Sequence, residues 1–111
     1  MRTDPYIKDV SSLGITARCK DNYDPWRCRF YRGIIQGESY HVTHIRMTSD
    51  FTYIKLEDKE DTYNSVNFEF ILDGKEHDIY SDNRCMSDAL LLRQQILEER
   101  YKHEIATQDN D

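Results

Sequence analysis

The chain has 111 residues, a common size for one domain, and its aromatic content of 12% excludes an intrinsically disordered chain. Its net charge of −6 argues against a general nucleic-acid-binding protein, because such proteins carry basic surfaces. No apolar run approaches the roughly 20 residues of a membrane-spanning helix, and no leader sequence follows Met1.

These properties predict a single domain over residues 1–111, with an ordered core over about 6–104 and a frayed C-terminal tail. The absence of a leader favours a reducing, cytoplasmic location. The three cysteines, Cys19, Cys28 and Cys85, have no metal-site spacing. A reducing compartment favours free thiols, although the sequence leaves a Cys19–Cys28 pair open.

The first half of the chain predicts a β-hairpin. Residues 13–19 form its first strand, a turn-rich stretch covers 20–25, and residues 26–35 form its second strand. The second strand alternates with a period of two, which is typical of a half-buried strand. One of its faces consists of Trp26, Cys28 and Phe30. The other face consists of Arg27, Arg29 and Tyr31.

Short strands continue after this hairpin at spacings of about 8–12 residues. They are predicted at 40–47, 51–56, 63–72 and 76–80. The dipeptide Asp73-Gly74 indicates a tight hairpin turn between the last two. The apolar face of the long 63–72 strand consists of Val66, Phe68, Phe70 and Leu72.

The pattern changes to a helix near the end of the chain, over about 86–105. Three candidate N-cap residues stand just before it, namely Ser81, Asp82 and Asn83. Its apolar residues form two neighbouring stripes that make one wide face suited to covering a sheet. These residues are Ala89, Leu90, Leu92, Ile96, Leu97 and Tyr101. The expected fold is α+β but mainly β, a bent antiparallel sheet or partly open barrel of six to seven strands capped by one C-terminal helix.

Strands first and a helix last is also the element order of the pleckstrin-homology (PH) family. The segment 26–32, Trp-Arg-Cys-Arg-Phe-Tyr-Arg, resembles the second strand of PH domains. The segments 68–72 and 77–80, with a glycine turn between them, resemble the last two strands. The resemblance implies a PH-like sandwich and a binding or adaptor function in signalling.

A basic stretch supplies the candidate binding residues. From Arg18 to Arg32 the chain has five basic and two acidic residues, a local net charge of +3. Lys20, Arg27 and Arg29 match the phosphoinositide signature of the PH family, which implies an anion site at the first hairpin, with Arg32 adding charge nearby. Arg27 and Arg29 leave one strand face, so their guanidinium groups converge. The alternative is a solvated strand face neutralised by neighbouring aspartates.

No metal, cofactor or catalytic group is predicted. His41 and His44 are three residues apart, so on one strand they point to opposite faces and do not converge on a metal. His77 and Cys85 flank the last strand without the further groups that a nucleophile pair needs. The carboxylates of 57–61 lack the order of a calcium loop.

The sequence therefore favours a non-catalytic binding module that recognises a protein or peptide partner, or a phosphoinositide headgroup at a membrane surface. The acidic body favours protein over lipid. The first alternative is an acidic accessory or inhibitor protein of viral or phage type that occupies a basic site on its target. The second is a small α+β enzyme. No nucleic acid is expected as a partner, and the oligomeric state is left open.

Overall fold

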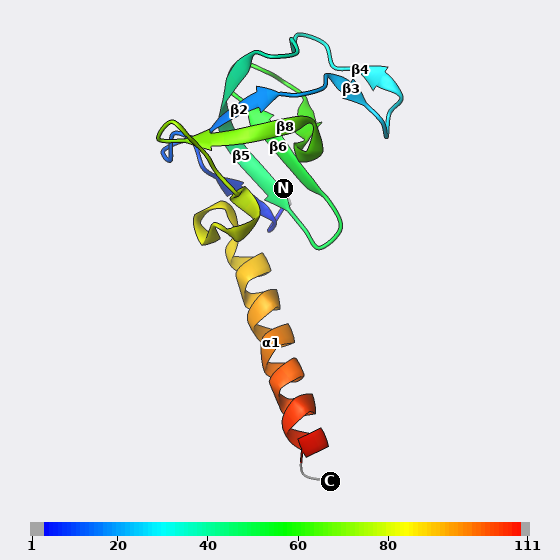
Figure 1. The fold of residues 1–111 in the computed structure, drawn as a ribbon, viewed down its shortest axis with the longest axis vertical. Coiled ribbons are helices and arrows are strands. Elements are labelled where there is room, and N and C mark those ends of the chain that lie inside the picture. Colours follow the sequence, from blue (N-terminus) through cyan, green and yellow to red (C-terminus); the bar gives the residue numbers. More distant parts are fainter. Residues whose placement is uncertain (1–3, 110–111) are drawn as a thin grey trace.

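The computed structural model describes residues 4–109, with side chains described as far as Lys102. It contains a seven-stranded antiparallel sheet, a separate two-stranded hairpin and one C-terminal helix, which confirms the predicted mainly-β α+β class (Figure 1). The strands are β1 (Ile7–Asp9), β2 (Thr16–Cys19), β3 (Tyr23–Asp24), β4 (Arg29–Phe30), β5 (Ser39–Met47), β6 (Thr52–Leu56), β7 (Thr62–Asn64), β8 (Phe68–Leu72) and β9 (Lys75–Glu76). The helical segments are the 3₁₀ turns η1 (Ser65–Asn67), η2 (Ile79–Ser81) and η3 (Asn83–Cys85) and the helix α1 (Asp88–Asp109).

The long strand β5 organises the sheet, whose order is β7-β6-β5-β2-β8-β9. One edge of β5 pairs with β6, and the other pairs first with β2 and then with β1. The β5–β6 register shifts between Val42 and His44, as in a β-bulge. The shift keeps Val42 and Ile45 in the core, so His44 and Arg46 point to the outer face.

The core lies between the strands and the first turn of α1. Its side chains that are buried from solvent almost completely are Val10, Ile15, Ala17, Cys19, Val42, Ile45, Ile54, Ile79 and Cys85. A buried polar network joins the 20–37 segment to this core. The Tyr31 hydroxyl accepts a hydrogen bond from the Asn64 N–H (3.1 Å) and donates one to Asn67 Oδ1 (3.1 Å). Asn67 Nδ2 donates in turn to the backbone carbonyls of Asp21 and Tyr23.

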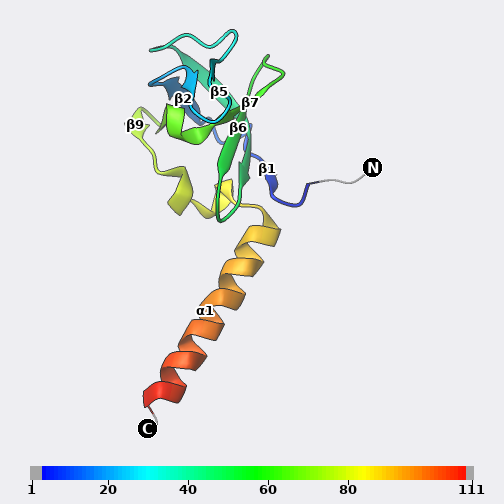
Figure 2. The same cartoon turned by 90° about the vertical axis from the view of Figure 1, so that its right-hand side faces the viewer.

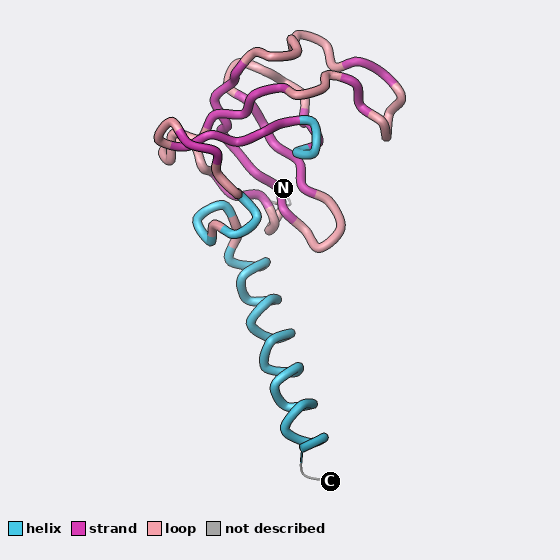
Figure 3. Tube along the Cα trace, viewed as in Figure 1, coloured by secondary structure: helices cyan, strands magenta, loops and turns pink. Residues whose placement is uncertain are grey.

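The predicted strand at 26–35 and its pairing with 13–19 are wrong. β2 pairs with β5 and β8, and the 20–37 segment is an excursion that holds only the short β3–β4 hairpin (Figure 3). The Asp24 carboxylate accepts hydrogen bonds from the Trp26 and Arg27 N–H groups, and Cys28 has a φ of 53°, so the chain turns where a strand would continue.

The predicted long strand at 63–72 is interrupted by η1, which the Asn64 side chain caps through the N–H of Val66. Val66 is therefore 60% exposed rather than part of the core. The Asp73-Gly74 turn is confirmed, because both residues have the positive φ that a type I′ turn requires. The predicted strand at 76–80 is largely replaced by the turn η2.

The helix α1 begins at Asp88, two residues after its predicted start, and the Ser87 hydroxyl before it accepts a hydrogen bond from the Leu90 N–H. The predicted N-cap residue Asp82 caps η3 instead. Met86 and Leu90 are buried at the base of α1, but the remaining turns extend away from the sheet (Figure 2). The predicted covering of the sheet by the apolar helix face is therefore wrong beyond the first turn. The predicted tail starts within α1, and residues 110–111 lie outside the described residues.

Candidate protein-binding surface

The projecting part of α1 exposes large apolar side chains on two sides, with Leu92 and Ile96 on one and Leu97 and Tyr101 on the other. Leu92 is 58% exposed, Ile96 50%, Leu97 53% and Tyr101 66%. Most helices in proteins are stabilised by packing of their apolar face. An apolar face without a partner inside its own chain is typical of a surface that binds another molecule.

A groove continues this apolar face onto the sheet. It lies between the β5–β6 hairpin loop and the first turns of α1, with a volume of about 460 Å³. The hairpin contributes Met47 and Phe51 to its walls, while the helix side contributes Met86, Leu90 and Leu97. Methionine and aromatic side chains are enriched in the central part of protein interfaces.

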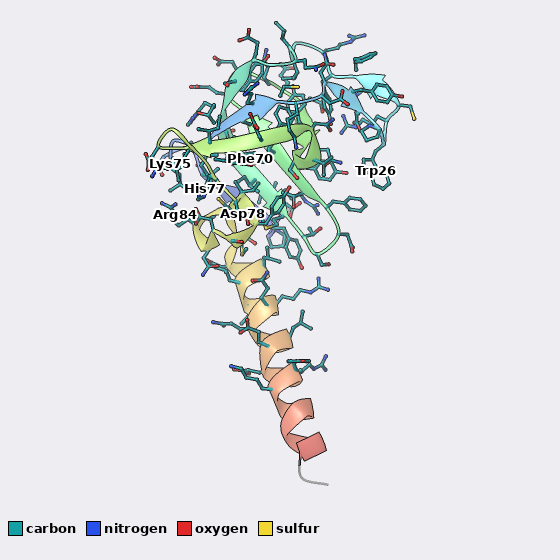
Figure 4. All side chains as sticks on the ribbon, viewed as in Figure 1. Trp26, Phe70, Lys75, His77, Asp78 and Arg84 are labelled. Carbon is teal, nitrogen blue, oxygen red and sulfur yellow. The ribbon has the colours of Figure 1, made fainter. Side chains whose placement is uncertain are left out.

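Aromatic side chains extend the surface beyond the groove. The Trp26 ring packs edge-on against Phe51, with ring centroids 5.3 Å apart, and Phe51 lies 6.2 Å from the ring of Tyr53. Trp26 is 66% exposed and extends from the β3–β4 hairpin on the side of the β5–β6 loop (Figure 4). The Asp24 turn and the Tyr31 network hold the segment that carries it. The Trp26 and Phe51 rings therefore present a joint exposed patch.

The charges on α1 are divided between its two sides. At about 3.6 residues per turn, Arg93 and Arg100 lie on one side of the helix, between Ile96 and Leu97. The acidic residues of the described turns, Asp88, Glu98 and Glu99, lie on the opposite side together with Lys102. Arg93 also lines the groove and forms no ion pair with any side chain of residues 4–102. The exposed apolar face is therefore cationic along its middle.

The predicted anion site is divided in the structure. Arg27 and Arg29 both lie near Asp61, at 3.2 Å and 3.7 Å from its carboxylate. Burial alone would raise the pKa of Asp61, but hydrogen bonds from Thr62 and Arg27 lower it below its usual value. Asp61 therefore stays ionised and neutralises part of the charge that the sequence assigned to a ligand.

The other two predicted residues lie apart from this pair. Lys20 lines a different depression, beside Ser65 and Glu69, and not the one that Arg27 lines. Arg32 is exposed and forms no ion pair with the side chains described in residues 4–102. Of the four residues, the structure brings together only Arg27 and Arg29.

The sequence signal for the surface on α1 was present but was interpreted as a core face. Arg93 and Arg100 fall within the stripe pattern that predicts contact with the sheet, and a buried cation without a partner is costly. The position of these two arginines between the apolar stripes was the sign in the sequence that this face of the helix is exposed. The contribution of Trp26 was not visible in the sequence, because the predicted strand gave it a regular alternating position.

The histidine and cysteine candidates have structural partners. His77 Nε2 lies 2.8 Å from Asp82 Oδ2, and Arg84 contacts the same carboxylate at 2.7 Å. Hydrogen bonds, first from Arg84, hold the pKa of Asp82 well below its usual range. Cys85 is fully buried, and burial raises the pKa of its thiol to about 11. A neutral, inaccessible thiol does not act as a nucleophile with His77.

All three cysteines are free, so Cys19 and Cys28 are not paired. Cys19 is buried on β2, while Cys28 is exposed at the β3–β4 turn. Within residues 4–102, no group of three or more His, Cys, Asp or Glu side chains converges as metal ligands would. No helix found in residues 4–109 combines the length and apolar character that crossing a membrane demands.

The chain was compared with known protein families. Residues 28–89, more than half of the chain, match the sequence model of the family described as Bacteriophage T4 protein Y07B. The matched segment runs from the β3–β4 turn to the start of α1, so it includes β5, β6 and Met86 at the base of the groove, whereas Leu90, Arg93 and Leu97 lie beyond it. Neither the curated proteins nor the solved structures contain a match to the chain.

Proposed function

The chain belongs to the family of bacteriophage T4 protein Y07B, and we propose that it is a phage accessory protein that binds a partner protein in the infected cell's cytoplasm and catalyses no reaction. The observation that carries this proposal is the exposed apolar face of α1, continuous with the groove under the β5–β6 loop. Burying a large apolar side chain contributes about 1.5–3 kcal/mol, so Leu97 and Tyr101, on the groove side of α1, supply a driving force for association.

The partner that fits this surface is an amphipathic helix with acidic side chains beside its apolar stripe. Such a helix lays its apolar residues against Leu97 and Phe51, in the helix-in-groove mode of recognition. Arg93 and Arg100 are seven residues apart, about 10 Å along the axis of α1. Carboxylates two helical turns apart on the partner would meet both guanidinium groups.

A second copy of the chain fits this surface less well. Either orientation of two α1 helices packed through this face brings Arg93 and Arg100 of one copy toward the same residues of the other. Like charges in an apolar contact are costly, and the net charge of −6 on each copy adds repulsion between the bodies. The acidic helix of another protein avoids the repulsion between arginines, because its carboxylates pair with Arg93 and Arg100.

A photo-crosslinking experiment tests the proposal. A photoreactive amino acid replaces Leu97 in one variant and Val66 in a matched control, because Val66 is similarly exposed but lies on η1, away from α1. Both proteins are irradiated in a lysate of phage-infected cells, and the crosslinked peptides are sequenced. We expect the Leu97 probe alone to crosslink, to an acidic amphipathic segment, and Arg93→Glu to abolish that product.

Three results would contradict the proposal. Equal capture by the Leu97 and Val66 probes would mean that neither surface is specific. A product of twice the mass of the chain would assign the face to a second copy. A captured segment without acidic residues, or capture that Arg93→Glu leaves unchanged, would remove the role of the arginines.

A second candidate function is an acidic inhibitor that occupies a basic site on its target. It is favoured by the surplus of carboxylates, of which Glu57, Asp58 and Glu60 are exposed together in the β6–β7 loop. Binding of this kind weakens steeply with salt, because screening acts on exposed charges. Replacing the three acids by their amides would reduce binding in this case and leave binding through α1 unchanged.

A further inference from the structure

A depression on the outer face of the sheet is separate from the surface on α1. It has a volume of about 230 Å³ and lies over β5 and β6, with Ile7 of β1 and Thr62 of β7 at its sides. The β-bulge in β5 turns His44 and Arg46 toward this face. No residue of α1 lines it, so nothing in this inference depends on the proposed binding of a partner.

Every side chain of this depression that carries a charge near neutral pH is basic. Arg46 of β5 and Lys55 of β6 come from neighbouring strands, where Arg46 stands opposite Tyr53 and Lys55 opposite His44. Arg27 reaches the same depression from the β3–β4 turn, which is distant in the sequence. Three cations from three separate segments therefore converge on one small volume.

The neighbouring carboxylates hold two of these cations without lining the depression. Asp4 Oδ2 accepts a hydrogen bond from Arg46 Nε at 2.6 Å, and this contact lowers the pKa of Asp4. Asp61 contacts Arg27 through Nη1, at 3.2 Å. Both contacts orient the guanidinium groups, and the Asp4 contact uses Nε alone, leaving Nη1 and Nη2 of Arg46 for a ligand. Lys55 has no ion-pair partner among the side chains of residues 4–102.

We propose that this depression binds the phosphate group of a small phosphomonoester. Arg46 donates through its two terminal nitrogens, Lys55 contributes a point charge from the facing strand, and Arg27 adds charge at the rim. A phosphomonoester has a charge of about −1.5 to −2 near neutral pH and three acceptor oxygens, which matches several converging cations better than a carboxylate does. The ring of Tyr53 and the exposed side chain of Ile7 provide an apolar wall for the rest of the ligand.

Titration of the full chain with glycerol 3-phosphate, followed by NMR chemical shifts, tests this site. Lys55→Gln removes one of the cations without breaking an ion pair, and Lys75→Gln on β9 is the matched control with the same change in net charge. We expect saturable binding by the unmodified chain, weakened about tenfold by Lys55→Gln, as for the loss of one charge-assisted contact, and less than twofold by Lys75→Gln.

Each other outcome counts against the proposal. The absence of saturable shifts, or equal weakening by Lys55→Gln and Lys75→Gln, would overturn the site, because the second result indicates a response to net charge alone. Vesicles that contain phosphatidic acid carry the same phosphate group on a lipid. Binding to the vesicles without binding to glycerol 3-phosphate would overturn the assignment to a small soluble ligand.

Discussion

Replacing Tyr31 by Phe removes one oxygen atom from the network that fastens the 20–37 segment to the sheet. The ring of Tyr31 remains packed edge-on against Tyr63, with centroids 5.0 Å apart, so the cavity term is small. Two buried groups lose their partner, the Asn64 N–H and Asn67 Oδ1, each 3.1 Å from the lost oxygen. A buried polar group left unsatisfied costs about 1–3 kcal/mol, so for the two groups we expect a loss of about 2–6 kcal/mol in unfolding free energy.

Urea unfolding followed by far-UV circular dichroism measures this loss. Tyr101→Phe is the matched control, because Tyr101 is 66% exposed on α1 and its replacement should change stability by less than about 0.5 kcal/mol. A cost below about 0.5 kcal/mol for Tyr31→Phe would refute the reasoning, since it would mean that the two groups have water or other partners in the folded chain.

Leu90→Ala should cost about 2–3 kcal/mol in urea unfolding, because Leu90 is only 4% exposed at the base of α1, whereas Leu97→Ala should change stability by less than about 0.5 kcal/mol; equal effects would contradict the projecting helix. A thiol reagent at pH 8 should modify Cys28 in the folded chain and reach Cys85 only after denaturation, since Cys85 is buried and its pKa is raised to about 11. The pKa of Asp82 is lower in the folded chain than its ordinary value of 3.8, so its contribution to stability is present above that pH and is lost as pH falls further. Urea unfolding at stepped acid pH should show this loss below about pH 4, and Asp82→Asn should flatten it.

The sequence predicted correctly those elements that are defined by residues close together in the chain. Asp73-Gly74 forms the predicted turn because both residues adopt a positive φ with little steric cost. The strands β5 and β6 lie where β-branched and aromatic residues predicted them, and α1 begins within two residues of its predicted start. In each case the residues that define the element are neighbours in the chain.

The alternation at 26–35 was misleading because an alternating pattern does not say which face is buried, or whether the strand pairs at all. Tyr31, assigned to the same face as the arginines, is 5% exposed, while Trp26 and Phe30 are 66% and 65% exposed. The Asp24 turn ends the strand geometry, and the hydrogen bonds of Tyr31 to residues more than thirty positions away fix its inward orientation. Contacts of that kind leave no local trace in the sequence.

The sequence by itself therefore determined the class of fold, the order of strands and helix, and the position of α1, all of which follow from side-chain periodicity and turn chemistry. Only the tertiary structure decided that β5 pairs with three other strands, that Arg27 joins Arg46 and Lys55 rather than Lys20, and that the apolar face of α1 is directed to solvent. These features depend on which distant segments meet. Periodicity specifies that a face is apolar, whereas the partner of that face is set by the packing of the whole chain.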